Sequence, residues 1–466
     1  MDDLVALFLV VIASLLSVGA LGELLFKRTR IPDAIWLIAA GLGLRLYGVV
    51  PEEVLHTITP YFAAVTLVIV LFEGGSRLSL ADLVGAAPRA TLMSVLGYVA
   101  AMFTVAVFTL AISAIGVLPE AWTFWHGLLT GAIVGGTSSL ILTPALALTR
   151  VSPKITRIIQ LEASLTDALC VVVSLALIGV MASEAQGAAV AATAVARSFG
   201  IAVGLGVLAG WAWVPVSRLL ARNARIYPLT LAALFFVYVF AQHAGGSPPM
   251  AVLAFAVVVG NASLLMRWLI KGTPKGPELG ASVRAVHSQI SFIIKALFFT
   301  YMGLMLSPPW SLLIFGSILG VLLLLVRVPI VGLVLRGRDF GEDERGAARI
   351  CMPRGMAAGA LAMMPMIAGV PGTETLHTLV FATIAATIVV FTIGFRTSQG
   401  TWPLRPVGTA ARAPAISGPD PDEVTATEAA ERDLLDDDDD PHEELPRDLP
   451  LYLGAEAKRQ DVSRDS

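Results

Sequence analysis

The chain has 466 residues, of which 56% are hydrophobic and only 14% charged, so it carries more apolar surface than one soluble core of that length needs. The formal net charge is −3, and both cysteines, Cys170 and Cys351, fall inside apolar segments. This composition indicates a membrane protein and excludes a disulfide framework or a cysteine-rich metal site.

Thirteen apolar segments follow one another along the chain. A bilayer core needs roughly 20 apolar residues per helix, and several of the segments are shorter than this. We therefore predict an all-α membrane protein of about thirteen transmembrane helices, at residues 3–25, 34–50, 60–74, 90–117, 125–146, 157–182, 191–219, 228–243, 247–269, 287–306, 310–335, 348–369 and 374–395.

Positive charge gathers in alternate connections between these segments. Lysine and arginine recur after the first, third, fifth, seventh, ninth and eleventh segments, and Arg197 is the exception on the opposite side. The positive-inside rule then predicts a cell-membrane protein with its N-terminus outside and its C-terminus in the cytoplasm.

The end of the chain differs in composition from the rest. Residues 397–466 hold 17 acidic and 7 basic side chains, whereas residues 1–396 hold 18 acidic and 25 basic ones. The tail cannot bury enough apolar area to offset its ordering entropy. We predict a transmembrane domain over 1–396 and a disordered acidic cytoplasmic tail over 397–466, whose default role is to balance the basic cytoplasmic loops.

Two segments are crowded with residues that interrupt helices. Segment 125–146 contains GAIVGGTSSLILTPAL, and segment 348–369 contains CMPRGMAAGALAMMPMIAGVPG. Irregular backbone at membrane depth survives where it is buried or lines a cavity, so both are predicted to be broken helices. They occupy matching places if 1–182 and 228–395 are inverted repeats, which favours a transporter binding site. The alternative is that small residues only let helices pack closely.

Ionisable residues near the bilayer centre are costly and persist mainly when they are paired or functional. Glu162 and Asp167 share segment 157–182 and point about 140° apart on a helix. We predict that Glu162 forms a structural ion pair with Arg354. Asp167 has two interpretations: a neutralising pair with Lys295, or an exchanging carboxylate.

Hydroxyl groups favour the exchanging carboxylate. Thr166 is adjacent to Asp167, and the hydroxyls of Thr137, Ser138 and Ser139 belong to a predicted broken helix. Oxygen ligands suit a small hard cation. We therefore predict a monovalent cation site at Asp167 with Thr137, Thr166 and Ser138, while Lys295 either modulates Asp167 or is displaced by the cation.

Other polar residues are weaker candidates. Arg327 is interpreted as a snorkelling side chain, and the six histidines are scattered at segment edges without metal-ligand spacing. The sequence holds no catalytic triad order, HExxH or phosphate loop. We therefore expect no enzyme activity, no cofactor and no nucleic-acid partner.

Six motifs in chain order resemble the monovalent cation:proton antiporter superfamily, in particular its sodium/proton exchanger branch. They are RIPDAIWLIAAGLGL, VLFEGGSRLSL, LEASLTDAL, GGSPPMAVLAFAVVVGN, KALFFTYMGL and MPRGMAAGALA, and the similarity covers nearly all of residues 10–395. Two positions depart from the family pattern: Thr166 stands where the family has Asn, and Ala163 where it has Ser.

The resemblance implies that Asp167 is the transporting carboxylate, that Thr137 belongs to the broken-helix ion site and that Glu162 pairs with Arg354. It also implies a homodimer within membrane lipid, in which a core bundle slides against a dimerisation domain. The two departures leave the choice of ion and the stoichiometry open.

The sequence thus leads to one main hypothesis and two alternatives. The main hypothesis is exchange of Na+ or K+ for H+, electroneutral because only one carboxylate does the work. The alternatives are a potassium efflux system of the glutathione-regulated type that conducts like a channel, and a non-transporting sensor or scaffold. The first would be expected to carry a regulatory nucleotide domain, and the second gives no reason for Asp167, Thr137 and Arg354 to lie in the membrane.

Overall fold

The computed structural model describes the main part of the chain in several ranges. These are residues 2–29, 31–48, 52–78, 88–147, 149, 151–182, 188–219, 226–262, 281–306, 310–337 and 340–397. The chain divides into two units, Met1–Arg405 and Pro406–Ser466. The predicted acidic tail lies outside the described residues, apart from residue 397, and the predicted boundary after residue 396 stays a prediction.

The elements of the described residues are α-helices, which confirms the predicted all-α class. In chain order they are α1 (Asp2–Thr29), α2 (Asp33–Leu46), α3 (Glu52–Arg77), α5 (Pro88–Ala114), α6 (Phe124–Val134), α7 (Ser139–Ala147), α8 (Pro153–Ala182), α9 (Ala188–Leu219), α10 (Ile226–His243), α11 (Pro248–Gly260), α13 (Ala281–Met305), α14 (Trp310–Val334), α15 (Glu342–Ile350), α16 (Met356–Ile367) and α17 (Leu376–Thr397).

Eight of the described spans are long and apolar enough to cross a membrane, with α6 and α7 together forming one of them. Shorter apolar helices occur at Ala13–Phe26, Pro248–Gly260, Gln289–Met305 and Met356–Ile367. The predicted segments therefore coincide with helices in the described ranges. The count of thirteen crossings and the inverted repeats stay predictions.

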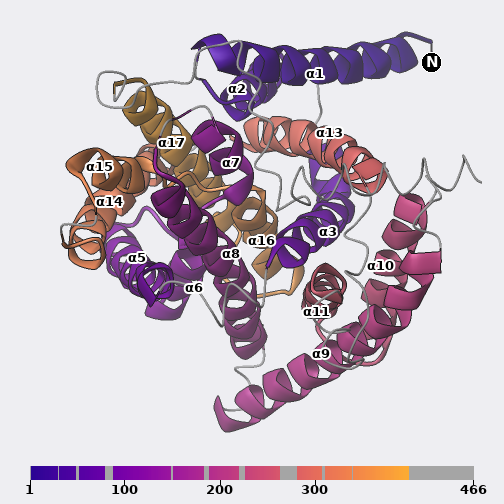
Figure 1. Ribbon diagram of the computed structural model, residues 1–466. Helices are drawn as coiled ribbons and strands as arrows, with labels where there is room; N and C mark the ends of the chain where they lie inside the picture. Colours follow the sequence, from indigo (N-terminus) through magenta and orange to yellow (C-terminus); the bar gives the residue numbers. More distant parts are fainter. Residues whose placement is uncertain are drawn as a thin grey trace, which may run out of the picture. The chain divides into compact units, whose positions relative to one another are not determined.

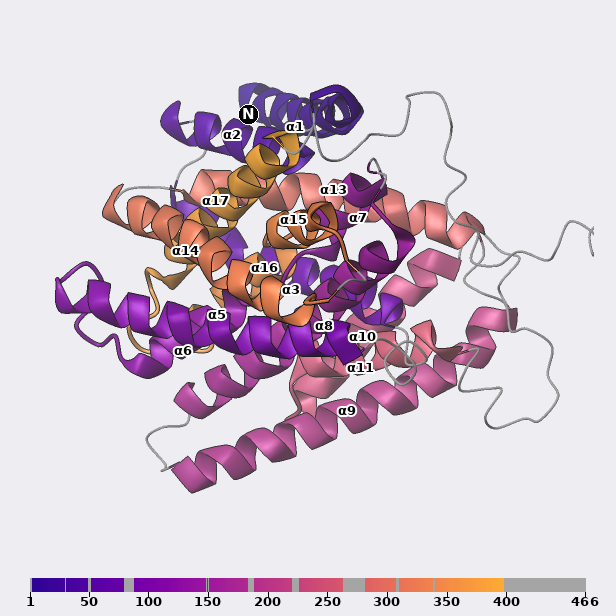
Figure 2. The same ribbon diagram turned by 60° about the vertical axis from the view of Figure 1, so that its left-hand side comes forward.

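The helices pack in two groups (Figure 1). The core group consists of α5–α8 and α14–α17, in which α5 packs on α6 and α14 packs on α17. The flanking group consists of α1–α3, α9–α11 and α13, in which α2 packs on α13 and α11 packs between α9 and α3; the second view shows α9 running along α10 and α11 (Figure 2). The most extensive contact between the groups joins α3 to α16.

Both predicted broken helices are broken in the structure. Residues 135–138 separate α6 from α7, and residues 351–355 separate α15 from α16. The two breaks cross, because the backbone N–H of Ser138 donates to the carbonyl of Pro353 at 2.8 Å. Gly355 allows this approach: a Cβ built there would lie 2.6 Å from the Cβ of Ser138. The crossing thus lies in the middle of the core group and exposes helix ends inside it.

Candidate functional site

Thr166 of α8 holds the first break in place. Its Oγ1 accepts the backbone N–H of Thr137 at 3.1 Å and lies 3.2 Å from the hydroxyl of Thr137. The same oxygen contacts the carbonyls of Glu162 at 2.9 Å and Ala163 at 3.1 Å within its own helix. Both threonines are buried, with 1% and 2% of their surface exposed. Thr166 thus satisfies backbone that the interruption of α6 leaves unpaired.

Asp167 lies beside this break and faces the start of α7. The hydroxyl of Ser139, the first residue of α7, donates to Asp167 Oδ2 at 3.3 Å. Asp167 is partly exposed, whereas Ser138 next to Ser139 is buried. A helix N-terminus carries partial positive charge and favours a carboxylate. Asp167 therefore has one hydroxyl group and one helix end as neighbours, and it forms no ion pair among the described residues.

Arg354 binds the C-terminal end of a helix, whereas Asp167 faces an N-terminal end. It lies in the second break, with 4% of its surface exposed, and its Nη1 donates to the carbonyl of Gly136, just beyond the end of α6, at 2.5 Å. Its backbone N–H donates to the hydroxyl of Thr387 in α17 at 3.1 Å. Carbonyls at a helix C-terminus lack partners and carry partial negative charge, so a buried guanidinium is stabilised there.

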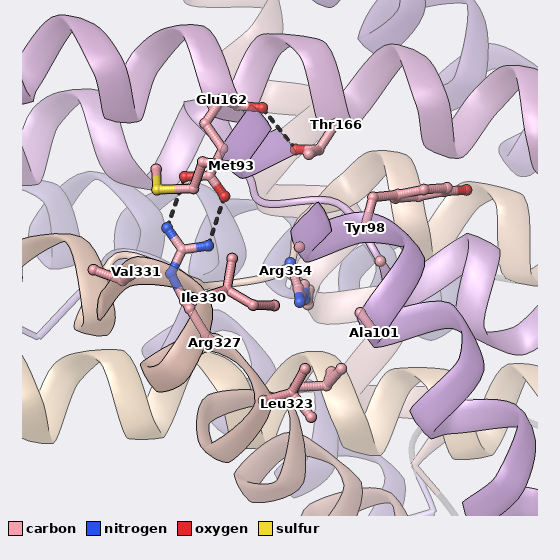
Figure 3. Close-up of a pocket in the computed structure, with 13 residues that line it drawn as sticks. Met93, Tyr98, Ala101, Glu162, Thr166, Leu323, Arg327, Ile330, Val331 and Arg354 are labelled. Atoms are coloured by element: carbon pink, nitrogen blue, oxygen red, sulfur yellow. Dashed lines mark hydrogen bonds and ion pairs between the residues drawn. The ribbon is translucent and has the colours of Figure 1, made fainter. Parts of the chain in front are cut away.

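The predicted Glu162–Arg354 pair is wrong in its basic partner. Arg327 of α14 donates Nη1 and Nη2 to the two carboxylate oxygens of Glu162 at 2.6 and 2.7 Å (Figure 3). Its Nε donates to the carbonyl of Ala348 at 2.7 Å. This two-point geometry matches the guanidinium fork to the carboxylate. Arg354 instead donates to the carbonyl of Gly136.

The snorkelling interpretation of Arg327 is also wrong, since only 9% of its surface is exposed. Arg327 lies deep in an apolar segment rather than at its end. A buried charge in a membrane segment needs a partner, and this rule could have identified Arg327 from the sequence as a paired residue.

Lys295 does not pair with Asp167. Its ammonium group lies 2.6 Å from Asp33 Oδ2 at the start of α2, and above the ring of Phe292 at 5.6 Å from the ring centre. This ion pair connects α13 to α2 within the flanking group. The sequence left open a neutralising pair between Lys295 and Asp167. Lys295 instead links two tightly packed helices.

Two further charged residues lie at the end of α3. Glu73 is buried, and its carboxylate forms an ion pair with Arg77 at 2.6 Å. The described residues contain no cluster of three or more histidine, cysteine or acidic side chains that suits a transition metal. A carboxylate beside the hydroxyl of Ser139 is suited to a proton or a hard monovalent cation.

Comparison with known proteins agrees with this arrangement. Residues 11–397 match the family described as sodium/hydrogen exchanger, transmembrane. The K+/H+ antiporter NhaP2 of Shewanella oneidensis is 27% identical over 410 residues, which are 83% of this chain and 66% of that protein. The probable Na+/H+ antiporter 2 of Methanocaldococcus jannaschii is 25% identical over 380 residues, which are 77% of this chain and 85% of that protein.

The fold is similar to that of a solved structure. The sodium proton antiporter MjNhaP1 of Methanocaldococcus jannaschii superposes with a TM-score of 0.64 at 18% identity, covering 83% of this chain and 94% of that one. The chain spans less than two thirds, 66%, of the length of the Shewanella protein. From the family match over most of its length, the chain belongs to the transmembrane sodium/hydrogen exchanger family.

Proposed function

We propose that this protein exchanges a monovalent cation, Na+ or K+, for H+ across the membrane. The observation that carries the proposal is the position of Asp167, a partly exposed carboxylate facing the start of α7 at the crossing of two broken helices. A carboxylate there binds either a proton or a desolvated cation. Competition between the two for one site is sufficient for antiport.

Asp167 carries the exchange, and its surroundings shape the site. Thr137, Thr166 and Ser138 set the backbone around the crossing, and their oxygens serve as further ligands of the cation. Since one carboxylate does the work, the exchange is electroneutral, with one cation moved per proton. Both ions are named in the relatives, K+ in the Shewanella protein and Na+ in the Methanocaldococcus proteins.

The site reaches the two sides of the membrane by movement of the core group against the flanking group. Asp167, Thr137 and Arg354 all belong to the core group, so the crossing travels as one unit. The tight packing of α2 on α13, with the Lys295–Asp33 pair, favours a rigid flanking group. The protein acts as a homodimer in the cell membrane, with the N-terminus outside and the acidic tail in the cytoplasm.

Everted membrane vesicles with a pH-sensitive dye test the proposal. Addition of Na+ or K+ to acidified vesicles should dequench the dye in the wild type and not in Asp167→Asn, which keeps the shape of the side chain and removes its charge. Glu342→Gln removes a carboxylate that is 70% exposed on α15 and serves as the matched control. Dequenching that survives Asp167→Asn contradicts the mechanism.

The same assay identifies the cation and the stoichiometry. Rates measured across Li+, Na+ and K+ give the selectivity. Rates measured with and without an imposed membrane potential give the charge moved: an electroneutral exchanger responds equally to both conditions, and a channel-like efflux system does not.

A further inference from the structure

A small cavity lies in the core group, beside the buried charges but away from the Asp167 carboxylate. Its volume is about 20 Å³, and its walls come from α5, α8, α14 and both breaks (Figure 3). The polar members of its lining are Glu162, Thr166, Tyr98, Arg327 and Arg354. A cavity needs roughly 10–15 Å³ to hold one water molecule and polar partners to keep it there, so the space fits about one water.

Arg354 supplies an unused donor to this cavity. Its side chain is buried, and its Nε has no hydrogen-bond partner among the described residues, although Nη1 binds the carbonyl of Gly136. A buried charged donor left without an acceptor is strongly disfavoured. Arg354 therefore brings an unpaired buried donor to the residues that line the cavity.

Glu162 supplies acceptors in the same wall. Each of its carboxylate oxygens receives one hydrogen bond from Arg327, and a carboxylate oxygen has room for a second. The cavity wall therefore holds two guanidinium groups and one carboxylate. Among the described residues Arg354 makes no direct hydrogen bond or ion pair with Glu162, whose two carboxylate oxygens bind Arg327.

We infer that the cavity binds one water molecule, which accepts a hydrogen bond from Arg354 Nε and donates one to the Glu162 carboxylate. The water gives Arg354 the link to Glu162 that the direct Arg327 pair prevents. The Glu162 carboxylate then binds two arginines, Arg327 directly and Arg354 through the water. Bridging waters of this kind recur where buried polar groups lack direct partners.

Hydroxyl-radical footprinting of the full chain in detergent or nanodiscs tests the inference, because radiolysis of a bound water oxidises the side chain beside it. Met93 lines the cavity and is 1% exposed, whereas Met363 and Met302 are each 0% exposed and do not line it. We expect Met93 to be oxidised several-fold faster than Met363 and Met302. Equal rates at all three methionines would overturn the proposal.

A cavity-filling variant sharpens the test. Ala101 lines the cavity and is only 3% exposed, so Ala101→Val adds volume in buried space beside the cavity. Ala101→Val should reduce the oxidation of Met93 to the rate of Met363. Ala241→Val, at a buried alanine of α10 that does not line the cavity, should leave Met93 unchanged. Unchanged oxidation in a folded Ala101→Val protein counts against the water.

The ion in the buffer separates water from a small anion. Oxidation of Met93 should be the same in chloride and in gluconate if the occupant is water. A rise on removal of chloride shows that an anion occupies the site and overturns the assignment. None of these measurements uses transport, so the outcome is independent of the proposed antiport.

Discussion

At the scale of single residues, the site is organised by complementary helix ends. Asp167 faces the N-terminal end of α7 through Ser139, and Arg354 faces the C-terminal end of α6 through the carbonyl of Gly136. Each charge thus meets partial charge of the opposite sign without forming a direct ion pair with the other. A carboxylate without a direct ion-pair partner suits the proposed exchange of a proton for a cation.

Competition at Asp167 predicts how transport depends on pH. If proton and cation share the carboxylate, lowering the pH should raise the apparent KM for the cation, by up to about tenfold per pH unit for one competing proton. The maximal rate at saturating cation should change much less. Dye dequenching measured over a matrix of cation concentrations and pH values gives both quantities. An apparent KM that is independent of pH would argue for separate proton and cation sites.

The Glu162–Arg327 pair predicts a stability effect. Glu162→Gln leaves the buried Arg327 charge without its carboxylate and should lower stability by about 3–5 kcal/mol, read as an earlier thermal transition in detergent. The double variant Glu162→Met/Arg327→Met should recover much of this loss. Glu342→Gln, which breaks an exposed pair with Arg345, should cost at most about 1 kcal/mol.

A double-mutant cycle distinguishes the two possible partners of Glu162. Coupling of Glu162→Gln with Arg327→Gln should exceed its coupling with Arg354→Gln, since only Arg327 contacts the carboxylate directly. The reverse order would restore the pairing expected from the sequence. Thermal unfolding of the three single and two double variants supplies the cycle.

At the scale of elements, the crossing depends on close backbone approach. The N–H of Ser138 reaches the carbonyl of Pro353, and the space above Gly355 is occupied by the Ser138 side chain. Small residues in these segments therefore bring two interrupted helices into hydrogen-bond contact. A lipid-facing helix would not require such residues.

Gly355→Ala tests this contact. The added methyl meets the Cβ of Ser138 at 2.6 Å, so one of the breaks must shift, and we expect lower thermal stability and slower transport. Ser138→Gly in the same chain removes the obstacle and should restore the stability. Gly332→Ala in α14, where a Cβ meets nothing within 4 Å, is the control. A fully stable Gly355→Ala protein would show that the crossing tolerates displacement.

At the scale of the whole molecule, the two helix groups meet where α16 lies against α3 and α13. A Cβ built at Gly359 of α16 would overlap Cζ of Phe298 of α13, so the glycine leaves room for this ring, which is 0% exposed. A glycine opposite a flat ring leaves a smooth surface on that side of the core group. Such a surface suits the proposed movement of one group against the other.

Gly359→Val is expected to hinder this movement. The larger side chain presses on Phe298 at the boundary between the groups, so the maximal transport rate should fall severalfold while the apparent KM for the cation changes little. Phe298→Ala in the same protein should recover part of the rate. A fall in cation affinity instead of rate would place the effect at the ion site.

The sequence alone determined the membrane class, the helical fold and the two broken segments, because apolar length and the density of Gly, Pro, Ser and Thr act locally along the chain. It also predicted an ion site at Asp167, and the structure brings the hydroxyl of Ser139 to that carboxylate. Only the tertiary structure decided which charges meet. Glu162 and Arg327 are 165 residues apart, and Lys295 joins Asp33 across two helices. Such pairs depend on which helices lie side by side after folding, and one-dimensional patterns do not contain that information.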